Sequence, residues 1–116
     1  MADRNRHSSY ALVYAAILAQ LQEIAREHGY ALGVHGSMAT DLDLIACPWT
    51  DDAGEPQDMI DAFCKYLKLM WDIPDVGNPV VKPHGRLAWC LHFDHKSPYS
   101  VGGPYLDVSV MPRSSR

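Results

Sequence analysis

The stretch HGSMATDLDLIACPW, residues 35–49, decides how this chain folds. In its second half, apolar residues alternate with Asp41 and Asp43, which is the pattern of a half-buried β-strand. Alternate residues of a strand share one face, so both aspartates point to one side and the leucines beside them point to the other. Two adjacent carboxylates repel each other and require a cation, hydrogen-bond donors or solvent around them.

A third aspartate lies in a similar context near the C-terminus. In YLDVSVMP, Asp107 is flanked by Leu106 and Val108, and a lone aspartate is uncommon inside an apolar strand unless it is paired or binds a metal ion. Mg²⁺, or Mn²⁺ in its place, prefers carboxylate oxygens, and Mg²⁺ retains waters that a phosphate can replace. Asp41, Asp43 and Asp107 are therefore candidate metal ligands and catalytic residues of a phosphoryl-transfer site.

A structural interpretation of these residues stays open. Asp41 can cap the turn that follows Thr40, and Asp43 can accept hydrogen bonds from backbone or arginine donors. Gly36 and Ser37, which precede the aspartates, also form a common turn pair.

Helical periodicity occurs in two segments. From Tyr10 onward, apolar residues recur at helical spacing, Ser8 or Ser9 can cap the first turn, and Gly29 is placed to end the helix. A second helix is expected to begin at Pro56, because proline suits the first helical position. Its expected buried residues are Ile60, Phe63, Leu67 and Met70.

Five segments have the composition of strands. They are Tyr30–His35, Asp41–Trp49, Val80–Lys82, Arg86–Phe93 and Tyr105–Met111. The order α-β-β-α-β-β-β predicts an α+β fold with one mixed sheet packed by two helices. With 116 residues, the chain has room for a single core, so we expect one domain over residues 1–116, flexible at 1–7 and 113–116.

Composition narrows the class of protein. Hydrophobic residues make up 47% and charged residues 21%, the balance of a soluble globular protein. The net charge of −4 and pI near 5.8 provide no strong nucleic-acid signal. The longest apolar stretch, from Tyr10 to Leu21, is too short and too periodic to cross a membrane. The N-terminus MADRNRHSS is charged and lacks the apolar segment of a signal peptide, so a cytoplasmic location is expected.

The sequence also predicts the burial of the cysteines and tryptophans. Cys47, Cys64 and Cys90 lie within apolar runs without metal-like spacing, so they are expected to be buried free thiols, which fits a reducing cytoplasm. The three tryptophans, at positions 49, 71 and 89, lie in or beside apolar runs and are expected to pack in the core.

A basic segment lies between the second helix and the last strand. In VVKPHGRLAW, Lys82 and Arg86 bracket a turn that contains His84, so these residues are candidates for contact with a phosphate-bearing ligand. In the alternative, Arg86 is a structural counter-ion of the acidic cluster. His92 and His95 point to opposite faces of a strand, which disfavours a zinc site there.

These motifs together resemble the nucleotidyltransferase fold of the DNA polymerase beta type. The resemblance lies in an apolar strand, Gly-Ser, Asp-x-Asp, and a later strand with a lone aspartate. It implies that Gly36 and Ser37 hold the phosphates of a nucleotide, that Asp41 and Asp43 ligate metal, and that Asp107 is a third carboxylate that activates the attacking hydroxyl. Compared with the minimal nucleotidyltransferases, GSMATDLDL keeps the key residues but has a shorter segment between Ser37 and Asp41.

The sequence also resembles a group of short phage and prophage proteins with HGS-x-A-x-DLDLIA-x-PW, which implies a phage origin and a host bacterial cytoplasm. Two hypotheses follow. The first is a phage-encoded protein that binds Mg²⁺ and a nucleotide and, if active, transfers a nucleotidyl group to a hydroxyl acceptor. The second is a non-catalytic protein that sequesters a nucleotide signal of host defence or docks on a host protein, or an assembly protein that uses the fold as a scaffold. The oligomeric state stays open.

Overall fold

The helices and strands follow the predicted order α-β-β-α-β-β-β. A computed structural model describes residues 10–36, 38, 41–72, 76–93 and 105–113. Its elements are α2 (Tyr10–Glu27), β1 (Tyr30–His35), β2 (Asp41–Pro48), α3 (Pro56–Leu67), β3 (Val80–Val81), the 3-10 turn η1 (Pro83–Gly85), β4 (Leu87–His92) and β5 (Tyr105–Val110). This confirms the expected α+β class with two helices and a five-stranded mixed sheet.

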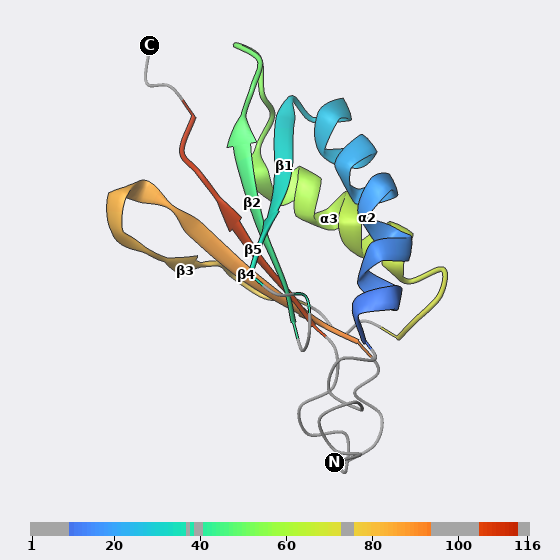
Figure 1. The fold of residues 1–116 in the computed structure, drawn as a ribbon. Coiled ribbons are helices and arrows are strands. Elements are labelled where there is room, and N and C mark those ends of the chain that lie inside the picture. Colours follow the sequence, from blue (N-terminus) through green and yellow to red (C-terminus); the bar gives the residue numbers. More distant parts are fainter. Residues whose placement is uncertain (1–9, 37, 39–40, 73–75, 94–104, 114–116) are drawn as a thin grey trace.

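The strands form one sheet in the order β1-β2-β5-β4-β3. β2 and β5 are parallel, whereas β1 with β2, β4 with β5 and β3 with β4 are antiparallel. Figure 1 shows α2 and α3 on the same side of the sheet. The opposite face, called the open face below, therefore carries neither of the two described helices.

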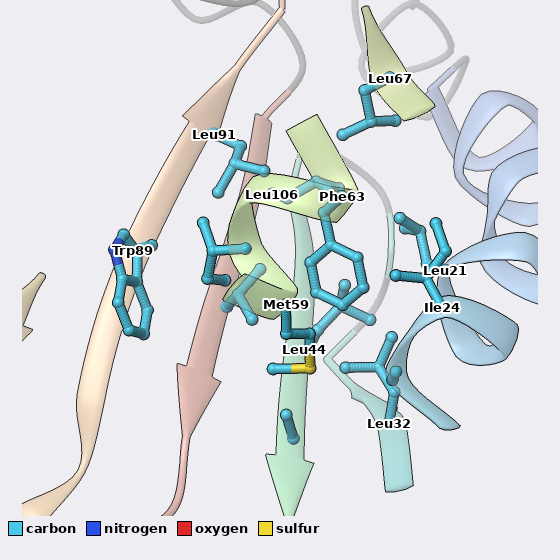
Figure 2. Packing of buried hydrophobic residues seen from close by; sticks show 14 of the residues in the cluster. Leu21, Ile24, Leu32, Leu44, Met59, Phe63, Leu67, Trp89, Leu91 and Leu106 are labelled. Carbon is cyan, nitrogen blue, oxygen red and sulfur yellow. The ribbon is translucent and has the colours of Figure 1, made fainter. Parts of the chain in front are cut away.

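The face that the sheet turns toward the helices is apolar. Leu42 and Leu44 of β2 are 0% exposed, as are Leu106 and Val108 of β5. Phe63 of α3 packs against this face together with residues of α2 and β4 (Figure 2). Because burial of apolar surface is the main favourable contribution to folding, these strands fold with this face inward.

The helices bury the stripes that their periodicity predicts, with one exception. The fully or nearly buried residues are Tyr14, Ile17, Leu21, Ile24 and Ala25 in α2, and Met59, Ile60, Phe63, Cys64 and Leu67 in α3. Pro56 begins α3, as expected. The prediction that Met70 lies in the buried stripe is wrong: α3 ends at Leu67, and Met70, beyond that end, is 48% exposed.

Gly29 lies between α2 and β1 in the left-handed region, with a φ of 87°, which confirms its expected role at the end of the helix. A Cβ atom at this position would lie 2.7 Å from the Cα atom of Ala53. The carbonyl oxygen of Gly29 accepts hydrogen bonds from the backbone amides of Trp49 and Thr50, at 2.8 and 3.2 Å. Glycine is required here because the left-handed turn and the close approach leave no room for a side chain.

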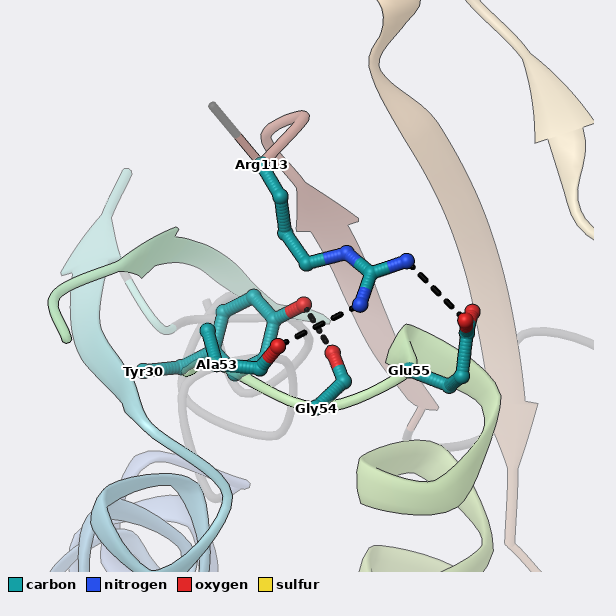
Figure 3. Close-up of polar contacts among 5 residues, drawn as sticks. All are labelled: Tyr30, Ala53, Gly54, Glu55 and Arg113. Carbon is teal, nitrogen blue, oxygen red and sulfur yellow. Dashed lines mark hydrogen bonds and ion pairs between the residues drawn. The ribbon is translucent and has the colours of Figure 1, made fainter. Parts of the chain in front are cut away.

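Polar contacts fix the segment between β2 and α3 (Figure 3). The Tyr30 hydroxyl donates a hydrogen bond of 2.7 Å to the carbonyl oxygen of Gly54. The guanidinium group of Arg113 donates to the carbonyl oxygen of Ala53 at 3.3 Å and to the carboxylate of Glu55 at 3.0 Å. Arg113, at the start of a segment expected to be flexible, thus ties the chain after β5 to this connection.

Three predictions of burial are wrong. Cys47 and Cys90 are exposed, because both occupy strand positions that point to the open face. Trp49 is 79% exposed, because it follows the end of β2 and does not point into the core. Cys64 and Trp89 are buried as expected, and the Trp71 ring stacks on Phe93 at a centroid distance of 4.9 Å.

Some expectations lie outside the described residues. They are the cap at Ser8 or Ser9, the flexible segment 1–7, residues 114–116, His95 and the connection between β4 and β5. Neither α2 nor α3 is long and apolar enough to cross a bilayer, a finding confined to the part of the chain that the structure describes.

The core predicts a clear contrast between two leucine truncations. We expect Leu44→Ala to lower the free energy of unfolding by roughly 2–5 kcal/mol, because it removes a fully buried side chain from the centre of the sheet. The same truncation at Leu12, which is 82% exposed on α2, is expected to change it by less than about 0.5 kcal/mol. Urea denaturation of both variants measures the difference, and equal losses would contradict this packing.

Candidate functional site

A row of polar side chains crosses the open face. Asp43 of β2 lies opposite His35 of β1 on one side and opposite Asp107 of β5 on the other. Asp107 in turn lies opposite Cys90 of β4. Neighbouring strands are about 4.8 Å apart, so residues paired in register on one face have adjacent side chains. The structure thus brings together two aspartates that are 64 positions apart, in the row His35–Asp43–Asp107–Cys90.

A second row adjoins the first on the same face. Asp41 lies opposite Tyr105, and Tyr105 lies opposite His92. The rings of His92 and Tyr105 stack at a centroid distance of 5.1 Å. Burial, followed by the charge of Asp41, raises the pKa of the Tyr105 hydroxyl. Asp41 therefore lies between Asp43 on its own strand and Tyr105 on the next, and all three candidate carboxylates share one face.

The environment of Asp43 disfavours its charged form. Burial is the largest cause, followed by a hydrogen bond and charge repulsion from Asp41 and the charge of Asp107, and together they raise the pKa of Asp43 from 3.8 to about 6. His35 acts in the opposite direction and lowers it. Because opposite charge favours ionisation, a cation bound beside Asp43 would stabilise its charged form against both burial and the neighbouring carboxylates.

Gly36 gives this carboxyl room. Its φ is 87°, in the left-handed region, and a Cβ at this position would lie 3.0 Å from Oδ2 of Asp43. Met38 also has a positive φ, 63°, so the backbone at Met38 does not have the right-handed conformation of an α-helix. The helix that opens at Gly-Ser in the resembled family is therefore not continued through Met38. Ser37, the other residue expected to hold phosphate, lies outside the described residues.

The basic segment forms a turn at the far edge of the sheet. The Lys82 amide donates a hydrogen bond of 2.8 Å to the carbonyl oxygen of Arg86, which closes the turn and ends β3 at Val81. His84, at its exposed tip, has a φ of 66°. Lys82 and Arg86 belong to this turn. β3 therefore ends one residue earlier than expected, at Val81, and β4 begins one residue later, at Leu87.

Arg86 reaches the open face. Its Nη1 donates a hydrogen bond of 2.8 Å to Oγ of Ser109, which lies two residues beyond Asp107 on the same strand and the same face. Within the described part of the chain, Arg86 thus contacts a hydroxyl next to the acidic cluster, and no carboxylate, which disfavours its interpretation as a structural counter-ion. The structure brings Lys82 and Arg86 to the side of the sheet that carries the aspartates and leaves His84 exposed at the tip.

The donor set suits one kind of metal site. Among residues 10–36, 38, 41–72, 76–93 and 105–113, no three His, Cys, Asp or Glu side chains form a group that could hold a metal ion by themselves. Mg²⁺ is usually bound by only one or two carboxylates, with waters and substrate phosphates completing its shell. Asp43 and Asp107 are paired in register and supply two carboxylates. They therefore suit a Mg²⁺ ion that is completed by waters and phosphates better than a metal ion held by protein ligands alone.

Several neighbours of the aspartates were not predicted from the sequence. Cys90 lies opposite Asp107, and Tyr105 lies opposite Asp41, only because of the strand register, which periodicity does not reveal. Ser109 follows Asp107 by two residues, so the alternation of β5 is the signal that places it on the same face. His35, the last residue of β1, is exposed and lies opposite Asp43.

Comparison with known proteins adds no relative: no protein-family model and no curated protein sequence matches this chain. The function is therefore inferred from the residues of the open face.

The raised pKa of Asp43 predicts a pH dependence of stability. Because its pKa of about 6 in the folded protein exceeds the ordinary 3.8, the folded protein binds more protons than the unfolded chain between these values. The free energy of unfolding should therefore fall as pH rises from about 4 to above 6, and Asp43→Asn should remove this part of the slope. At neutral pH we expect the variant to melt roughly 2–5 °C higher than the wild type.

Urea unfolding of both proteins at several pH values between about 4 and 7 measures the two slopes. Carboxyl groups far from position 43 contribute equally to both proteins, so the difference between the slopes reports on Asp43 and its interactions with Asp41 and Asp107. Identical slopes would show that the carboxyl of Asp43 titrates normally.

Proposed function

We propose that this protein binds Mg²⁺, or Mn²⁺, together with a nucleoside triphosphate on its open face and transfers the nucleotidyl group to a hydroxyl acceptor. The observation that carries the proposal is the pairing of Asp43 with Asp107 on adjacent parallel strands, with Asp41 on the same face. Three acidic side chains from two strands can build a two-metal site for phosphoryl transfer. The resemblance to nucleotidyltransferases assigns the same three residues.

In this proposal Asp43 and Asp107 would hold the metal, with waters and substrate phosphates completing its shell, and Asp41 is the further ligand that the resemblance assigns. The bound ion would neutralise charge that develops on the phosphoryl oxygens. The acceptor oxygen attacks the α-phosphorus, the bond to the leaving pyrophosphate breaks, and Asp107 accepts the hydroxyl proton. With a pKa of about 6, Asp43 is mostly charged at neutral pH and available as a ligand.

The cationic residues complete the proposed site. Arg86 is anchored to Ser109 beside the aspartates, and in this proposal Arg86 and Lys82 would balance the negative charge of a triphosphate. Gly36 leaves space beside Asp43. The proposed phosphate contacts of Ser37 and His84 derive from the resemblance and from the composition of the basic turn.

A second candidate is a non-catalytic protein that sequesters a nucleotide. The left-handed backbone of Met38 favours it, because no helix continues from Gly36 through this residue to hold phosphate with its amides. In that case Lys82 and Arg86 would contribute more to binding than the aspartates.

Metal-dependent nucleotide binding tests the two candidates. We expect ATP to bind the wild type at least about tenfold more tightly with Mg²⁺ than without it, and Asp43→Asn to lose most of that gain. Asp52→Asn, which makes the same change at an exposed position between β2 and α3, is the matched control and should bind like the wild type. Isothermal titration calorimetry measures all three proteins, and thin-layer analysis with radiolabelled ATP detects transfer.

Two results would contradict the proposed transferase activity. Wild-type protein that binds no nucleotide in the presence of Mg²⁺ or Mn²⁺ would exclude it. Tight binding that is indifferent to metal and to Asp43→Asn, but lost in Arg86→Ala, would support sequestration.

A further inference from the structure

A hollow of about 360 Å³ lies on the open face where β1 pairs with β2, and is called the β1–β2 hollow below. Its lining includes Ala31, Gly33, Ile45, Cys47 and Trp49. Ala31 lies opposite Cys47 and Gly33 lies opposite Ile45, on the face that also carries the aspartates of β2. None of these residues has an acidic or basic side chain, so the hollow suits an uncharged, apolar group.

The fold does not require glycine at position 33. Gly33 lies within β1, and its φ is not in the left-handed region that Gly29 and Gly36 occupy. Among the described residues, and apart from its chain neighbours, no atom lies within 4 Å of a Cβ built at this position. Glycine inside a strand weakens it and often marks a place where a ligand approaches the backbone. A ligand in the hollow would therefore explain a missing side chain that backbone conformation and crowding do not explain.

Trp49 supplies an aromatic residue at the margin of the same hollow. It is 79% exposed, although its backbone is held firmly. The amides of Trp49 and Thr50 both donate hydrogen bonds to the carbonyl oxygen of Gly29, and the amide of Gly54 donates to that of His28 at 2.9 Å. An exposed aromatic side chain on a fixed backbone loses little conformational freedom when a flat ring stacks on it. Such residues are the usual stacking partners of nucleobases.

The hollow borders the charged part of the open face. Ile45 follows Asp43 by two residues on the same face of β2, which corresponds to about 7 Å at the usual rise of a strand. Ile45 also lies opposite Ser109, whose hydroxyl accepts the hydrogen bond from Arg86. A single ligand with a flat ring and a phosphate chain can therefore reach the hollow, the carboxylates and the guanidinium group.

A nucleotide suits this position better than a partner protein. A stable protein interface covers about 800 Å² on each partner, so it would extend from the hollow over Asp43 and Asp107. Removing water from two carboxylates without supplying a counter-charge is costly. A nucleotide would place only its base in the hollow and would bring a metal ion to the carboxylates.

We infer that the β1–β2 hollow binds the base of the nucleotide, with the ring over Gly33 and against Trp49. The identification of the ligand as a nucleotide rests on the proposed function. In this arrangement the base lies over β1 and β2, and the phosphates extend across Asp43 and Asp107 toward Arg86.

Gly33→Val fills the hollow without disturbing the fold. Valine suits a strand and has room at this position, so the variant should melt at or above the wild-type temperature. Calorimetry with Mg²⁺ and ATP, GTP, CTP or UTP first identifies the nucleotide that the wild type binds most tightly. We expect Gly33→Val to bind that nucleotide at least about tenfold more weakly, because the base loses its place. Sodium triphosphate, which has no base, is the control ligand and should bind both proteins within about twofold.

Variants of Trp49 test the stacking. Trp49→Ala should weaken binding of the same nucleotide by about tenfold, whereas Trp49→Phe, which keeps an aromatic ring, should stay within about threefold of the wild type. Leu69→Ala is the matched control, because Leu69 is also 79% exposed but lies beyond the end of α3. It should bind like the wild type.

The outcomes separate this inference from the proposed function. If Gly33→Val and Trp49→Ala bind the nucleotide as the wild type does, the base site is wrong and the metal site is unaffected. If binding depends on Gly33 and Trp49 but is indifferent to metal and to Asp43→Asn, the base site is supported and the proposed transferase is not. If the wild type binds none of the four nucleotides, both are wrong.

Two further results would contradict the base site alone. Equal losses of nucleotide and triphosphate binding in Gly33→Val would show that the substitution does not act through the base. A wild-type dimer that dissociates in Trp49→Ala, with nucleotide affinity unchanged, would assign the hollow to a second copy of the chain. Sedimentation velocity of both proteins measures the oligomeric state.

Discussion

In the central pair of the sheet, Leu44 of β2 lies opposite Val108 of β5, and the preceding residues Asp43 and Asp107 lie opposite each other. The same parallel register therefore builds the centre of the core on one face and the acidic cluster on the other. A slip of one residue would turn the aspartates toward α3 and the apolar residues toward solvent, at a large cost in buried charge. Core packing thus holds the carboxylates together although they repel each other.

This arrangement links stability to the proposed chemistry. Burial and, after it, the neighbouring carboxylates raise the pKa of Asp43, so the folded protein carries a desolvation cost and a like-charge repulsion that the unfolded chain lacks. A bound cation would remove that repulsion, and stability and metal affinity therefore depend on the same residues. The left-handed glycine beside Asp43 serves the same site, since a side chain at position 36 would press on its carboxyl. Polar positions of this kind, unfavourable for folding alone, are typical of functional sites.

Much of the fold could be predicted from the sequence, and part of the site could not. The alternation in DLDL shows which residues of β2 share a face. Pro56 marks the start of α3 and Gly29 the end of α2, because each is a strong local signal. The predictions for Cys47 and Cys90 were wrong. Cysteine is usually buried, but a cysteine in a strand is buried only if a helix or loop covers its face of the sheet, and the sequence does not reveal which face is covered. The contact of Arg86 with Ser109 and the pairing of Cys90 with Asp107 depend on which strands are neighbours.

The sequence by itself determined the order of the elements, the buried faces of the two helices and the shared face of Asp41 and Asp43, since periodicity and capping act over a few residues. Only the tertiary structure decided that β5 inserts between β2 and β4, which sets Asp43 opposite Asp107 and brings Cys90 and Lys82 to the same edge. Strand order and register arise from packing between segments that are far apart in the chain. No local pattern specifies them, because a strand of given alternation can pair with any partner that buries its apolar face.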